Sequence, residues 1–177
     1  IVDLLDMLSE NMENAGVSKR HVRANATATW LFSAYCEGVP LLLAGPATTQ
    51  IADAFSCGIS GCTAARLSCD GEWNQNTANQ AVKSDSKVVL IENSFREGWM
   101  ERLCPLVLNS NELNHNKLFL FATPFWEDLA VEPKGLYQYM LPVFTDFFLD
   151  SIPKPLDAGS IWNSHPPTLK GNADGIC

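Results

Sequence analysis

The chain has 177 residues, of which 46% are hydrophobic, and a formal net charge of −8. That length suits one well-buried domain, and the acidic balance argues against a surface that follows nucleic-acid phosphates, so we do not expect nucleic acid as a partner. No apolar run approaches the roughly 20 residues of a membrane span, and no secretory leader pattern opens the chain. We therefore expect a cytoplasmic, non-membrane protein. Because the sequence begins at Ile1 and stops at Cys177, we also expect it to be part of a longer polypeptide.

The first forty residues predict two helices. Apolar residues repeat at helical spacing over residues 1–14, and a second helical pattern follows Ser18, which we expect to cap its start. Gly38 and Pro40 are expected to end that second helix. The basic run at 19–23 fits a solvated helix start, with a contact to a partner or to nucleic acid as the alternative.

From residue 41 onward, short apolar runs alternate with helical patterns. The predicted strands lie at 41–44, 63–68, 87–91, 118–122 and 143–149. The predicted helices between them lie at 46–57, around 76–83 and at 95–108. Pro105 is expected to bend or end the last of these helices. This alternation is typical of a three-layer αβα fold with a mainly parallel sheet.

The last stretch and the cysteines are organised differently. Residues 151–177 are rich in proline and glycine, which predicts an irregular tail, packed by Ile161 and Trp162, that follows a domain formed by residues 1–150. The six cysteines form no C-x-x-C pair and are expected to be mostly buried thiols. A three-ligand metal site at Cys57, Cys62 and Cys69 is the alternative, although no histidine lies near it in sequence.

Several landmarks follow one another in a recognisable order. Residues 41–52 read LLLAGPATTQIA, residues 88–93 read VVLIEN, and residues 118–124 read LFLFATP; the segments 126–129 and 141–144 follow. Over roughly residues 20–150 this order resembles the nucleotide-binding subdomain of AAA+ and related P-loop ATPases. The corresponding stretches there are an apolar strand with G-P-P-G-T-G-K-T, a Walker B strand ending in Asp-Glu, and the sensor-1 strand. The resemblance implies a P-loop NTPase-like sheet with strand order 5-1-4-3-2.

The departures from the family pattern fall on residues that carry chemistry. Gly45 and Thr49 keep the pattern, but Gln50, Ile51 and Ala52 stand where the family has its second glycine, its phosphate-binding lysine and its magnesium-binding hydroxyl. A lysine–phosphate contact near 4 Å is worth about 4 kcal/mol at an effective dielectric of about 20. Its loss weakens binding by up to about a thousandfold.

The Walker B and sensor-1 positions are altered as well. Glu92 keeps a carboxylate, whereas Asn93 stands where the family places the glutamate that activates water, and an amide cannot accept that proton. Thr123 or Pro124 takes the sensor-1 polar position. No arginine occurs after Arg102, so the arginine finger and sensor-2 arginine have no counterpart. We expect these positions to be the remains of a nucleotide site, gathered where the strands end, with no catalytic residue and no metal ligand.

The sequence thus predicts a degenerate AAA+-like domain that has lost hydrolysis, holds no cofactor, and serves as a scaffold or interaction module. Its partner would be another protein or the remainder of the same chain, reached through the first helix, the tail, or both. One alternative is an ATPase that is active or binds ATP and magnesium weakly through an atypical loop. Another is an α/β interaction domain unrelated to NTPases. Asp53, Asp70 and Glu72 are expected to be helix or turn residues.

Overall fold

The computed structural model describes residues 1–96, 98–113, 116–131, 135 and 138–150 of the chain. At its centre is a five-stranded sheet in the order β2-β3-β4-β1-β5, in which every neighbouring pair runs parallel. The strands are β1 (Leu41–Ala44), β2 (Ala65–Ser68), β3 (Val88–Glu92), β4 (Leu118–Thr123) and β5 (Leu141–Phe144). The parallel α/β fold and the predicted strand order 5-1-4-3-2 are confirmed.

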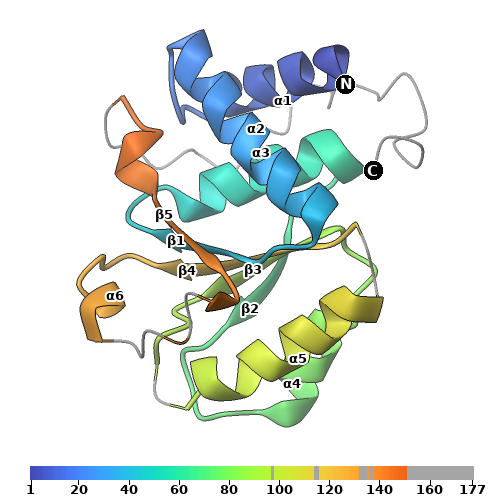
Figure 1. Ribbon diagram of the computed structural model, residues 1–177, viewed down its shortest axis with the longest axis vertical. Coiled ribbons are helices and arrows are strands. Elements are labelled where there is room, and N and C mark those ends of the chain that lie inside the picture. Colours follow the sequence, from blue (N-terminus) through green and yellow to red (C-terminus); the bar gives the residue numbers. More distant parts are fainter. Residues whose placement is uncertain (97, 114–115, 132–134, 136–137, 151–177) are drawn as a thin grey trace.

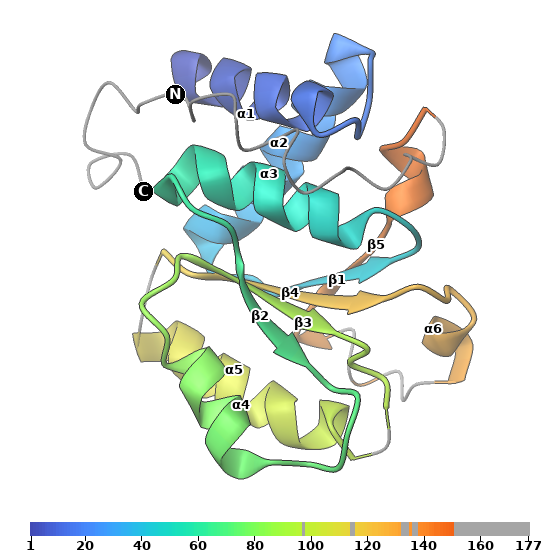
Figure 2. The same ribbon diagram turned by 180° about the vertical axis from the view of Figure 1, so that it is seen from behind.

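Helices cover both faces of this sheet (Figures 1 and 2). On one side lie α1 (Val2–Asn14), α2 (His21–Glu37) and α3 (Thr48–Ser60). On the other side lie α4 (Gln75–Val82) and α5 (Met100–Leu113). Two short elements come later in the chain, α6 (Asp128–Val131) after β4 and the 3-10 helix η2 (Thr145–Phe147) after β5. Within the described part of the chain, none of the helices has the length and apolar character that crossing a bilayer requires.

Strand β1 shows why the sheet is buried on both faces. Each of its four residues is at most 1% exposed. Leu41 and Leu43 belong to the apolar cluster beneath α1, α2 and α3, whereas Leu42 belongs to the cluster beneath α4 and α5, together with its register partner Phe121. An unbroken apolar run is what a parallel strand needs when helices cover both of its faces.

The outermost helix α1 packs closely onto α3 at Gly58. A Cβ atom at that position would overlap Cδ2 of the buried Leu8 side chain, so any larger residue would force Leu8 or the helices to move. The Asn11 side chain donates a hydrogen bond to the Ala54 carbonyl at 3.3 Å, which fixes the register of the two helices. Helix α1 therefore contributes to the core of the domain.

The last strand differs from the predicted segment at 143–149. Strand β5 runs from Leu141 to Phe144, and the chain then turns into η2. The turn is made by Thr145, which is completely buried and donates a hydrogen bond from its hydroxyl to the Pro46 carbonyl at 2.7 Å. Because this side chain points inward against the loop after β1, the alternation that continues beyond it does not extend the strand.

Helix α5 begins later than predicted and runs through its proline. It starts at Met100: Gly98 has a left-handed φ of 76°, and the Trp99 carbonyl accepts the Leu103 N–H at 2.8 Å, the first hydrogen bond of the helix. The Trp99 indole N–H donates to the Gly71 carbonyl at 2.7 Å. The Trp99 ring also meets Trp73 edge-on, with 4.9 Å between the ring centroids. Pro105 lies inside α5 without ending it. Proline has no backbone N–H, so α5 lacks one of its internal hydrogen bonds, near its start.

The prediction that Ser18 caps α2 is wrong. The helix begins at His21, and its N-cap residue, Arg20, makes no side-chain cap. The Ser18 hydroxyl instead donates to the Asp150 carboxylate at 2.9 Å, and Arg20 and Arg23 form ion pairs with that carboxylate at 3.7 and 3.5 Å. The basic run at the start of α2 is thus partly neutralised within the chain.

Candidate functional site

The carboxyl ends of β1, β3 and β4 meet at one edge of the sheet. The Gly45 N–H donates to the Thr123 carbonyl at 2.9 Å, and Glu92 at the end of β3 stands opposite Ala122 of β4. The Thr49 hydroxyl donates to Oε1 of Glu92 at 3.3 Å. Four of the predicted site positions, Gly45, Thr49, Glu92 and Thr123, are therefore brought together.

The other predicted positions in this loop are directed elsewhere, because α3 begins early. Only residues 45–47 separate β1 from Thr48, and the Ile51 N–H already donates to the Ala47 carbonyl at 3.0 Å, a helical hydrogen bond. Ile51 and Ala52 are both completely buried in the core beneath α1, α2 and α3, and Gln50 is half-buried. A side chain at position 51 consequently faces the core and not the edge of the sheet.

The segment after β5 packs against the loop after β1 and fills the space beside Gly45. Gly45 has a φ of 123°, and a Cβ atom there would lie 2.5 Å from the hydroxyl oxygen of Thr145. The backbone of Ala47 is also left-handed, with a φ of 64°. Thr145 was not among the predicted site positions, and nothing in its sequence pattern marks it, since it lies within the alternating run taken for a strand.

Asn93 and Asp70 form a polar cluster beside Glu92. The Asn93 amide donates to Oδ1 of Asp70 at 2.5 Å, and the Ser68 hydroxyl donates to the other carboxylate oxygen. The Ser68 hydrogen bond, and then that of Asn93, hold the pKa of Asp70 below its usual value, with a further contribution from the charge of Arg96. Asp70 is thus held as an anion at the edge of the sheet.

Thr123 closes the β4 end of the site. Its side chain is 2% exposed, and its hydroxyl donates to Oδ2 of Asp128 at 2.5 Å while accepting the Phe125 N–H at 3.2 Å. Both partners of the hydroxyl belong to the segment that follows β4. Thr123 therefore shapes the wall of the site and does not offer a free hydroxyl group to a ligand.

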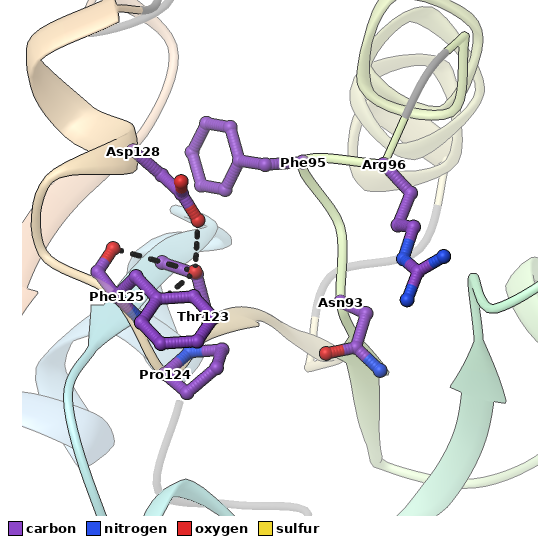
Figure 3. A pocket seen from close by; sticks show the side chains of 7 residues that line it. All are labelled: Asn93, Phe95, Arg96, Thr123, Pro124, Phe125 and Asp128. Atoms are coloured by element: carbon purple, nitrogen blue, oxygen red, sulfur yellow. Dashed lines mark hydrogen bonds between the residues drawn. The ribbon is translucent and has the colours of Figure 1, made fainter.

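Two adjoining pockets open along this edge. One has a volume of about 330 Å³ and the other about 230 Å³; they adjoin, since both are lined by Asn93, Thr123 and Pro124, and together they are called the cleft below. The larger pocket adds Phe95, Arg96, Phe125 and Asp128 to the lining. Figure 3 shows the Phe95 ring beside Asp128, with the Arg96 guanidinium and the Asn93 amide on the opposite side. The smaller pocket adds Thr48, Ser68, Asp70, Glu92 and Ala122.

This cleft lies where sequence reasoning placed a site, but most of its lining was missed. Ser68, Asp70 and Asp128 were not predicted as site positions. A signal existed for Ser68, because it is the last residue of a strand whose neighbours end at the same edge. Asp70 and Asp128 lie two and five residues beyond their strands, and only the folded loops bring them back to the cleft.

The five cysteines that the structure describes do not line the cleft. Cys57, Cys69 and Cys104 are buried thiols, Cys36 is half-buried and Cys62 is exposed, and none of these five is in a disulfide. Burial raises the pKa of Cys57 to about 11 and that of Cys69 to about 12. Among the described residues, no group of three or more metal-binding side chains comes together.

Comparison of the chain with protein-family models, with curated proteins and with solved structures finds no match.

Proposed function

We propose that this domain is a degenerate AAA+-like module that works by contact, as a scaffold or interaction domain, and does not hydrolyse ATP. The observation that carries the proposal is the burial of Ile51 and Ala52 in the core. A phosphate loop presents a lysine and a hydroxyl at these two places. Here, restoring those residue types alone would place a charge and a hydroxyl in an apolar core, at a cost of several kcal/mol for the charge.

The closed loop supports the same conclusion. In a phosphate loop, successive backbone N–H groups curl round the phosphates. In this chain the Thr145 side chain stands against Gly45, and α3 has completed its first turn by Ile51. The carboxylates of Asp70 and Glu92 line the adjoining pocket and would repel a polyphosphate.

The surface proposed for contact is the outer side of β5 and η2. Phe147 is 76% exposed and packs edge-on against Phe144, which is 39% exposed. By contrast, the exposed large apolar residues at α1 are Val2, its first residue, and Ile1 just before it. The tail, with Ile161 and Trp162, lies outside the described residues.

The backbone of β5 favours recognition through side chains. The Leu141 N–H donates to the Pro40 carbonyl at 3.2 Å, so the next residue, Pro142, directs its backbone toward the open edge. Proline has no N–H to offer to an added strand, a common protection of sheet edges. We therefore propose that the partner, another protein or another part of the same polypeptide, covers the Phe144 and Phe147 rings and does not extend the sheet.

The absence of nucleotide chemistry is tested by thermal denaturation with ATP, ADP and magnesium, together with phosphate release. A ligand at 100 times its Kd adds about 2.7 kcal/mol to the free energy of unfolding. For a domain of this size that is a rise in Tm of about 5–11 °C. We expect no such rise at 1 mM nucleotide and no turnover. Turnover that disappears in Glu92→Ala would instead establish the alternative of an active ATPase with an atypical loop.

The contact surface is tested by placing a photo-crosslinking amino acid at position 147, with position 22 as the matched control. Val22 is 80% exposed on α2, so both replacements leave the core untouched. We expect covalent adducts of defined mass from position 147 and none from position 22 in cells that make the protein. Equal labelling from the two positions, or labelling from neither, would contradict the proposed surface.

A further inference from the structure

The cleft at the carboxyl edge lies where the chain changes sides of the sheet. The loop after β1 leads to α3 on one face, whereas the loop after β3 leads to α5 on the other (Figures 1 and 2). Open α/β sheets hold ligands at such switch points, because diverging loops leave a crevice between them. The two joined pockets, of about 330 and 230 Å³, together reach the size of a small-molecule site.

The charge of the cleft is unequal along its length. The smaller pocket is lined by the carboxylates of Asp70 and Glu92, and no lysine or arginine is among the described residues that line it. Thr49 occupies Oε1 of Glu92, and Oε2 has no hydrogen bond to any described residue. Arg96 lines the larger pocket and its charge also acts on Asp70, but three carboxylates line the two pockets, those of Asp70, Glu92 and Asp128, against this one arginine. The smaller pocket, which carries two of these carboxylates, therefore attracts a cation that can donate hydrogen bonds.

The larger pocket of the cleft offers apolar surface. Phe125 is 61% exposed and Phe95 is half-buried, and both line the larger pocket next to Pro124 (Figure 3). An aromatic ring that stands exposed beside a pocket gains from being covered by an apolar group. The aromatic rings and the carboxylates lie in adjoining pockets, since Asn93 and Thr123 line both.

We infer that this cleft binds an organic cation, an ammonium or guanidinium group joined to an aromatic or aliphatic body. The cationic group lies between Asp70 and Glu92, and the apolar body lies against Phe95 and Phe125. The same chemistry is presented by a free amine and by a lysine or arginine side chain beside an apolar residue of a partner. This inference does not depend on the surface proposed on β5 and η2, which involves different residues.

The test is a titration of the isotope-labelled protein with phenethylammonium, followed by the backbone amide signals of the cleft residues. The neutral 2-phenylethanol and the anionic phenylacetate serve as matched ligands, and acetyl-Phe-Arg-amide represents a partner side chain. We expect the amine or the peptide to bind at least about tenfold more tightly than the neutral and anionic compounds, because two carboxylates lie near the cation. Whichever of the two binds more tightly identifies the source.

Variants separate the two ends of the cleft. Glu92→Gln should weaken binding of the cation about tenfold and leave 2-phenylethanol unchanged, whereas Phe125→Ala should weaken both. The control is Glu10→Gln, which removes one negative charge on the exposed side of α1 and should leave the affinity for both compounds unchanged. If Glu92→Gln fails to fold, Asp70→Asn takes its place. The inference would be overturned if phenylacetate bound as tightly as the amine, or if about 10 mM amine and peptide left the amide signals of the cleft unchanged. It would also be overturned if Glu92→Gln kept the preference for the cation over the neutral compound.

Discussion

Replacing Gly45 by alanine tests whether the loop after β1 is closed by Thr145. Two separate costs are expected. A φ of 123° is strained for any residue with a Cβ atom, at about 1–3 kcal/mol. The new Cβ atom would also stand 2.5 Å from the buried Thr145 hydroxyl oxygen, and overpacking of this kind costs about 1–3 kcal/mol. Gly45→Ala should therefore lower the free energy of unfolding by about 2–6 kcal/mol.

A matched variant separates these two costs. Gly61 also has a positive φ, 73°, but nothing lies within 4 Å of a Cβ atom placed there. Gly61→Ala should cost about 1–2 kcal/mol, from the backbone alone. Thr145→Ala removes the hydrogen bond to Pro46 and should cost about 1–3 kcal/mol. In the double variant Gly45→Ala/Thr145→Ala the close contact is gone, so its cost should fall about 1–3 kcal/mol short of the sum of the two single changes.

The assay is urea denaturation followed by circular dichroism, with the slope of the transition used to check that each variant unfolds in two states. Additive costs in the double variant would refute the contact between Gly45 and Thr145, and with it the closure of the loop. A cost of Gly45→Ala no larger than that of Gly61→Ala would refute it as well.

Two further predictions follow from charge and burial. The Ser18 hydrogen bond holds the pKa of Asp150 below its ordinary 3.8, so the stability due to that carboxylate should be present above pH 4 and lost as the pH falls through the lowered pKa. Asp150→Asn should lack this loss when the free energy of unfolding is measured between about pH 5 and about pH 2. The same loss of stability in acid in Asp150→Asn as in the wild type would contradict the prediction. Exposed Cys62 should react with an aromatic disulfide reagent in the native protein, while Cys57 and Cys69 react only in urea. Cys62→Ser should lose one equivalent of rapid reaction, and retention of that equivalent would point to another thiol.

The parts of the fold that followed from the sequence are those decided by local pattern. Strands β1, β3 and β4 are unbroken apolar runs between turn residues, and only burial on both faces accounts for such runs. The end of β5 did not follow, because it depends on a hydrogen bond between Thr145 and Pro46, which lie 99 positions apart. Alternation alone carries no information about such a contact.

The residues of the cleft also fall into those that the sequence predicted and those that it did not. That Gly45, Glu92 and Thr123 share an edge follows from the carboxyl ends of parallel strands, whereas the cluster of Ser68, Asp70 and Asn93 depends on how two loops fold back. The burial of Ile51 did have a signal in the sequence. Phe55 and Ile59 follow it at intervals of four, and all three side chains are at most 6% exposed. That spacing marks one face of a helix directed at the core.

The position of β1 in the sheet has a consequence for the growing chain on the ribosome. The strand pairs with residues 118–123 on one side and with residues 141–144 on the other, all of which are made much later. At about 5–20 residues per second, roughly 80 residues of further synthesis leave this apolar segment without its first strand neighbour for about 4–16 s. Helices α1, α2 and α3 are complete or nearly so soon after it, and they cover one of its faces. We therefore expect these three helices to cover one face of β1 until β4 and β5 have been synthesised.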